Sequence, residues 1–123
     1  MPKPDDPTRP APDTLVDTTE TVIVLTTWPA DRDPAELARP LVQERLAACV
    51  NALAEMRSFY AWKGDLCDEP ERQLVLKTTR AAVPRLLGRL RELHPYEVPE
   101  FLVLPAVAGS ASYLAWVAAS VEA

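Results

Sequence analysis

The sequence contains few of the residues on which the commonest functional sites depend. It has one histidine, His94, and two cysteines, Cys49 and Cys67, whose spacing matches neither a metal site nor a disulfide framework. It has no glycine-rich phosphate loop, no H-E-x-x-H helix and no C-x-x-C pair. The histidine also lacks a marked serine or cysteine partner for a nucleophilic triad. We therefore expect free thiols and a protein that is not an enzyme.

A cluster of positive charge and a long apolar segment are also missing. The formal net charge is -5, so the surface would repel the phosphates of nucleic acids and anionic membranes, and it favours cations as guests. No apolar run approaches the roughly 20 residues that span a bilayer, and residues 1–6 lack the apolar core of a secretory signal. We expect a cytoplasmic protein with no nucleic-acid partner and no membrane partner.

Proline is concentrated at the N-terminus. Residues 1–20 hold five of the 13 prolines and few large apolar residues before Leu15 and Val16. Such a segment buries too little apolar surface to offset the entropy lost on ordering. The sequence therefore predicts a disordered, proline-rich tail at 1–20 and a single domain at 21–123. The whole chain has 48% hydrophobic residues, which is ordinary for a globular protein.

Apolar and β-branched runs in the domain predict strands at residues 21–27, 48–62, 71–78 and 101–104. The long segment 48–62 reads as one long or twice-broken strand that turns at residues 63–65.

Capping residues and helical periodicity predict the helices. Asp33 as N-cap and Pro34 after it begin a first helix that runs to about Ala47, with a distortion at Pro40. A second helix covers the periodic leucines up to residue 93, and Ser110 caps a final helix.

The order of these elements predicts an α+β fold. A βαββαβ chain of this length forms a ferredoxin-like sandwich, with an antiparallel sheet of order 4-1-3-2 and both helices on one face, here followed by a C-terminal helix. The strands at 21–27, 71–78 and 101–104 each contain a continuous apolar stretch, whereas a sheet with one face exposed to water alternates apolar and polar residues. The second face therefore needs the C-terminal helix, a partner subunit, or both, and we predict a homo-oligomer.

The predicted sheet order brings several polar residues to one pole. The end of the first strand, with Thr26, Thr27 and Trp28, meets Glu71 there. The segment after the second helix and the turn at 63–65 lie alongside. Lys77 shares a face with Glu71 but is about 20 Å away at roughly 3.3 Å per residue, so a site using both would need a neighbouring chain.

Each of these candidates has more than one interpretation. The first interpretation of His94 is a metal ligand and the second is a proton carrier. The third is a structural role, in which its protonated form is stabilised by the dipole at a helix C-terminus. Tyr96 and Glu97 lie between two prolines in a rigid segment that suits a binding loop or a subunit contact. The carboxylates of Glu71, Glu97 and Glu100 are hard oxygen ligands, a general base or solvated side chains. The aromatic residues between 56 and 62 stack a ligand or pack against another subunit.

Several motifs together resemble the CutA divalent-cation tolerance family. They are residues 21–27, 45–51 (RLAACVN), 60–64 (YAWKG), Glu71 with 76–78 (LKT), and 94–100 (HPYEVPE). The likeness extends over residues 21–121, and the His-Pro-Tyr-Glu segment is its most specific part.

The resemblance implies a ferredoxin-like homotrimer, a likeness to PII signalling proteins and a role in tolerance of copper and other divalent metals. It places these residues near clefts between subunits: Trp62, Glu71, Lys77, Tyr96, Glu97 and His94. The family's copper ligands correspond here to Thr26, Leu93 and His94, so His94 is the candidate metal ligand and Cu(II) or another divalent ion the possible cofactor. A small anion, a PII-like signalling ligand and a purely structural scaffold stay open. So does an enzyme with Glu71 as base and Lys77 as anion holder.

Overall fold

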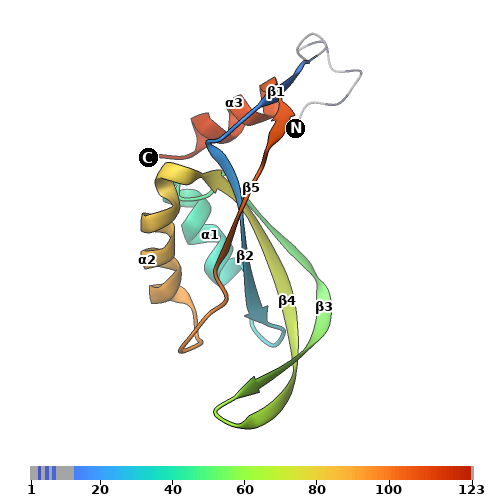
Figure 1. The fold of residues 1–123 in the computed structure, drawn as a ribbon, viewed down its shortest axis with the longest axis vertical. Coiled ribbons are helices and arrows are strands. Elements are labelled where there is room, and N and C mark those ends of the chain that lie inside the picture. Colours follow the sequence, from blue (N-terminus) through green and yellow to red (C-terminus); the bar gives the residue numbers. More distant parts are fainter. Residues whose placement is uncertain (1–2, 4, 6, 8–12, 123) are drawn as a thin grey trace.

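A four-stranded antiparallel sheet organises the protein (Figure 1). In this computed structural model, which describes residues 3, 5, 7 and 13–122, the sheet has the order β3-β4-β2-β5. Its strands are β2 (Thr21–Pro29), β3 (Cys49–Trp62), β4 (Asp65–Thr79) and β5 (Leu102–Pro105). The helices are α1 (Ala35–Gln43), α2 (Val83–Leu93) and α3 (Ala111–Ser120), with a 3-10 turn at Arg80–Ala82. The predicted α+β fold and its 4-1-3-2 sheet order are confirmed.

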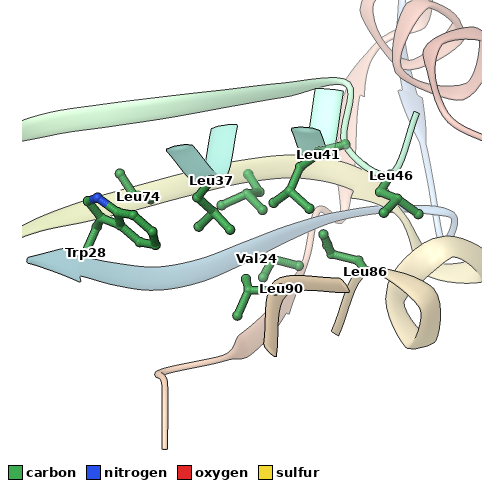
Figure 2. Packing of buried hydrophobic residues seen from close by; sticks show 10 residues of the cluster. Val24, Trp28, Leu37, Leu41, Leu46, Leu74, Leu86 and Leu90 are labelled. Carbon is green, nitrogen blue, oxygen red and sulfur yellow. The ribbon is translucent and has the colours of Figure 1, made fainter. Parts of the chain in front are cut away.

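The main core lies between one face of the sheet and the helices α1 and α2. Alternate residues of β2 point to this face, so Val24 and Trp28 are fully buried. Complete burial of such a side chain contributes roughly 1.5–3 kcal/mol, which makes this layer the main source of stability. Figure 2 shows the facing side chains, which include Leu37, Leu41, Leu74, Leu86 and Leu90.

Helix α1 is shorter than expected. The N-cap is Pro34 rather than the predicted Asp33, one residue later. The Asp33 carboxylate still accepts a 2.9 Å bond from the N–H of Ala35 at the start of the helix. The helix stops at Gln43 rather than near Ala47, since Arg45 adopts a left-handed φ of 60° that no helix continues. Pro40 lies inside the helix, as the sequence predicts.

Strand β4 begins earlier than expected and builds a long hairpin with β3. Their pairing runs from Trp62 opposite Asp65 down the length of both strands, with a register shift between Ala52 and Glu55. Strand β2 ends at Pro29, opposite Glu71, so no third strand of the described residues lies beside residues 57–70. We call residues 57–70 the hairpin arm. In Figure 1 it reaches past β2, away from α3.

An additional small sheet corrects the prediction that order begins at residue 21. Strand β1 (Leu15–Asp17) pairs with β6 (Ala108–Ser110). Asp13 accepts bonds of 3.1 and 3.0 Å from the N–H of Ser112 and so caps α3. The side chain of Ser110 makes no capping bond, contrary to expectation. The disorder predicted for residues 1–12 lies largely outside the described residues.

The second face of the sheet is only partly covered within one chain. Helix α3 packs through Val117 against Ala48 and Ala82 at one end of the sheet. On β5, Leu102 and Leu104 point to the face opposite α1 and α2, and they are 55% and 41% exposed. The prediction of a partner subunit on this face stays a prediction. No helix in the described ranges is long and apolar enough to cross a membrane.

Candidate ligand cleft

A cavity of about 750 Å³ lies between the hairpin arm and the segment that follows α2. Its floor consists of Thr27, Glu71 and Gln73 from β2 and β4, and one wall consists of residues 95–100. The opposite wall comes from β3, with Met56, Ser58, Phe59, Tyr60 and Trp62. A cavity of this size suits a small organic molecule.

The wall at residues 95–100 is held in place by the free edge of β2. Strand β5 pairs only with Val22 to Leu25, which leaves the edge of β2 from Thr26 onward without a strand partner. The segment after α2 occupies this edge, since the His94 ring bonds the carbonyl of Thr27. The Gln73 amide donates to the carbonyl of Thr26 at 2.7 Å and to Glu100 at 2.8 Å. Pro95 and Pro99 stiffen the segment further.

His94 uses both ring nitrogens in hydrogen bonds. A carbonyl only accepts, so Nε2 carries the proton and donates to Thr27 O at 2.6 Å. An amide N–H only donates, so Nδ1 accepts from Tyr96 N–H at 3.1 Å. The ring also packs edge-on against Trp28 at 5.1 Å. Burial lowers the pKa of His94, and this neutral tautomer leaves no lone pair free for a metal.

Glu71 and Tyr96 form a hydrogen-bonded pair beside the cavity floor. Glu71 is 5% exposed, and its Oε2 accepts a 2.6 Å bond from the Tyr96 hydroxyl. Burial and the Glu71 carboxylate raise the pKa of Tyr96 well above its ordinary value, so Tyr96 stays protonated and donates. In the described part of the chain, Glu71 makes no ion pair.

A lysine contacts two of the residues that line the cavity. The Lys63 ammonium lies 3.5 Å from Oε2 of Glu97 and 5.6 Å from the centre of the Trp62 ring. Both charged side chains are about 70% exposed, at 69% and 71%, so this pair is weak in water. The hairpin arm and the 95–100 wall therefore meet through a contact that opens at little cost.

Of the six residues that the family resemblance places near clefts, the structure brings four together and separates two. Trp62, Glu71, Tyr96 and Glu97 line the cavity, and His94 lies behind the wall. Lys77 lies elsewhere on β4, opposite Cys49, where its ammonium donates to Asn51. Glu71 pairs with Met56 and Lys77 with Cys49, so the two side chains are well separated along β4, and a site using both would still need a neighbouring chain. Sequence reasoning missed Gln73, although it is two residues from Glu71 on the same strand face.

The copper ligands implied by the family resemblance do not fit this chain. No group of three or more His, Cys, Asp or Glu side chains able to hold a metal ion occurs among the described residues. Thr26 is fully buried. Cys49 contacts the Tyr113 hydroxyl at 3.9 Å. With His94 engaged at both nitrogens, the geometry offers no preformed copper centre.

The fold and the cleft define a class of small ferredoxin-like proteins with a ligand-sized cavity at one end of the sheet. A family model described as CutA1 divalent ion tolerance protein matches residues 22–120. The chain is 44% identical over 94 residues to the divalent-cation tolerance protein CutA of Thermus thermophilus, covering 76% of this chain and 91% of that protein. It is 42% identical over 91 residues to human protein CutA, covering 74% of this chain and 51% of the human protein.

Solved structures give the same result. CutA from Synechococcus elongatus PCC7942 superposes with a TM-score of 0.82 at 35% identity, over 89% of this chain and 96% of that one. The Thermus thermophilus protein superposes with a TM-score of 0.79 at 40% identity, over 83% and 99%. The chain belongs to the CutA1 family of divalent ion tolerance proteins.

Proposed function

We propose that this protein acts in divalent-cation tolerance as a non-catalytic cytosolic homotrimer that binds a small ligand in clefts between its subunits. The observation that carries this proposal is the cavity of about 750 Å³ between the hairpin arm and the 95–100 wall. Its lining combines aromatic side chains with a few convergent polar groups, which is the usual composition of a small-molecule site.

The exposed hairpin arm supports assembly with further copies of the chain. Phe59 and Leu66 on the arm are 62% and 82% exposed, and the sheet face bearing Leu102 is also bare. Large apolar side chains exposed to this extent are typical of protein interfaces when they form a patch. A cavity that is open along such an arm is closed most simply by a neighbouring subunit.

Binding of an organic ligand is supported by a relative. One structure of CutA from Synechococcus elongatus PCC7942 is complexed with a Bis-Tris molecule. Tight chelation of copper has less support, because the described residues offer no cluster of metal ligands. Tolerance of cations would then depend on the state of an occupied cleft, as in a PII-like signalling protein, rather than on sequestering the metal.

Sedimentation equilibrium tests the assembly. A chain of 13.6 kDa gives a trimer of three times that mass, and Phe59→Asp should shift this species toward monomer by placing a charge on the arm. Leu15→Asp is the matched control, since Leu15 is 78% exposed but lies on β1 away from the arm. A wild-type monomer at micromolar concentration would refute the trimer.

A thermal-shift screen against a metabolite library tests the ligand and the absence of catalysis. Small molecules that stabilise the wild type should be recovered unchanged after prolonged incubation. Chemical turnover of any stabilising molecule would show that the protein is an enzyme.

A further inference from the structure

Glu71 is a buried carboxylate beside a cavity, and it has no counter-ion in the described part of the chain. It is 5% exposed, and its one hydrogen bond within the described residues comes from the Tyr96 hydroxyl to Oε2. Burying an ionised carboxylate is costly unless it is paired with a cation and its lone pairs are satisfied. The side chain lines the cavity, so a cation bound there would supply the missing partner.

The part of β3 that lines the cavity with Glu71 is rich in aromatic residues. Tyr60 and Trp62 both line the cavity from β3. The face of an aromatic ring attracts a cation through its quadrupole, and aromatic side chains gathered around a cavity recognise substituted ammonium ions. A carboxylate floor and an aromatic wall together favour an ammonium group attached to an organic body.

The ammonium group of Lys63 makes both kinds of contact, one with a carboxylate and one with an aromatic ring. Its Nζ lies between the Glu97 carboxylate, at 3.5 Å, and the Trp62 ring, at 5.6 Å to the centroid. This contact is exposed and involves a flexible side chain. Glu71 lines the same cavity as Tyr60 and Trp62, and no lysine or arginine of the described residues is paired with it.

Other classes of ligand fit less well. A divalent metal ion needs several hard or nitrogen ligands, and the described residues provide no such cluster. An anion would meet the carboxylates of Glu71, Glu97 and Glu100, all of which line the cavity. A neutral molecule would leave the charge of Glu71 uncompensated.

We propose that the cleft binds an organic ammonium ion, whose nitrogen pairs with Glu71 and whose body packs against Tyr60 and Trp62. This inference rests on the proposed function, because it uses the same cleft. The inference adds to the proposed function the chemical class of the ligand and the residue that selects its charge.

Isothermal titration calorimetry with probes of equal chain length tests the assignment. Putrescine carries ammonium groups, butanediol carries hydroxyls, and succinate carries carboxylates. The wild-type protein should bind putrescine at least about tenfold more tightly than butanediol, since a charge-paired hydrogen bond far exceeds a neutral one. Succinate should give no heat of binding.

Glu71→Gln tests the residue, because an amide oxygen still accepts the Tyr96 hydroxyl while the charge is gone. This variant should lose about tenfold or more in affinity for putrescine and keep its weak affinity for butanediol. Glu20→Gln is the matched control. It removes the same charge from an exposed position beside β2, far from the cavity, and should leave putrescine binding unchanged.

Three results would overturn the ammonium assignment. The first is that putrescine does not bind at millimolar concentration. The second is that it binds equally well to the wild type and to Glu71→Gln. The third is that Glu71→Gln dissociates the oligomer in sedimentation, because a cation of a partner subunit already pairs with Glu71. The proposed function would still stand if the wild type remains a trimer and a molecule of another class stabilises it. It falls separately if the wild type is a monomer or no library molecule shifts its melting temperature.

Discussion

The Tyr96 hydroxyl donates a hydrogen bond of 2.6 Å to Oε2 of Glu71, which joins the 95–100 wall to strand β4. The two residues are 25 positions apart in the chain. The wall has a second attachment just before it, through the His94 ring and the carbonyl of Thr27. A third contact joins the Gln73 amide to Glu100 at 2.8 Å. The shape of the cleft therefore depends on three polar contacts and two prolines rather than on a deep apolar core.

Tyr96→Phe removes the hydroxyl that donates to Glu71, so the buried carboxylate loses a hydrogen bond. We expect the free energy of unfolding to fall by about 1–3 kcal/mol, the usual cost of such an orphaned group. Urea denaturation at a fixed protomer concentration measures it. Tyr113→Phe is the control, because its hydroxyl has only a 3.9 Å contact with the Cys49 sulfur. Equal losses for the two variants would contradict the importance of the Glu71 contact.

The protonation of His94 should make the fold sensitive to mild acid. Burial lowers the pKa of His94 in the folded state below the value of about 6.5 for an unfolded chain. The stabilising contribution is therefore complete above about pH 6.5 and is lost as the pH falls from there through the folded-state pKa. The chain has one histidine, so its imidazole resonance in an NMR titration reports this value directly. A midpoint at or above that of a model peptide would contradict the prediction.

The same resonance tests whether the histidine ligates a metal. Because both ring nitrogens are engaged with Thr27 and Tyr96, addition of Zn(II) at neutral pH should leave the His94 signals in place. Diamagnetic Zn(II) is preferable here, since it avoids paramagnetic broadening. A saturable shift of the His94 signals, absent on addition of Mg(II), would restore the metal-ligand assignment.

Periodicity was sufficient to predict the sheet, because the apolar strands and amphipathic helices have clear repeats and short connections. The strand order then placed Glu71 near the end of β2, where the structure has it opposite Pro29. No sequence pattern indicated that α1 ends at Gln43. Its termination depends on the left-handed conformation of Arg45, which an arginine seldom adopts and no local pattern announces.

Long-range pairings in the terminal region also escaped prediction. Leu15 and Val16 are too few apolar residues to indicate a strand, and their partners are Ser110 and Gly109, far along the chain. Asp13 caps α3 across 99 positions of sequence, whereas capping rules assume a neighbour such as Ser110. In the cleft, the hydrogen bonds of His94 depend on a β2 edge left free by the shortness of β5.

Asp13→Ala should loosen the start of α3. Bonds to Ser112 lower the pKa of the Asp13 carboxyl, so its contribution is present above about pH 4 and is lost as the pH falls through the folded-state value. Hydrogen exchange at neutral pH should accelerate at the first amides of α3 in this variant. Asp17→Ala is the control, since Asp17 lies on β1 and has no capping role. Similar exchange in both variants would show that Asp13 does not hold the helix.

Pro40→Ala should stabilise the protein. Proline has no N–H, so the helix lacks the bond that residue 40 would donate to the Glu36 carbonyl, and its ring crowds that carbonyl. The cost of proline inside a helix is about 3 kcal/mol, but the unfolded chain gains conformational freedom when the proline is replaced, which offsets part of the gain. We therefore expect a net gain of about 1–2 kcal/mol in urea denaturation at a fixed protomer concentration.

Pro34→Ala is the matched control, because the N-terminal N–H groups of a helix have no intrahelical partner and the φ of -61° at Pro34 already suits proline. That variant should be unchanged or slightly less stable. If Pro40→Ala is also no more stable than wild type, then Pro40 does not destabilise α1 and the prediction is wrong.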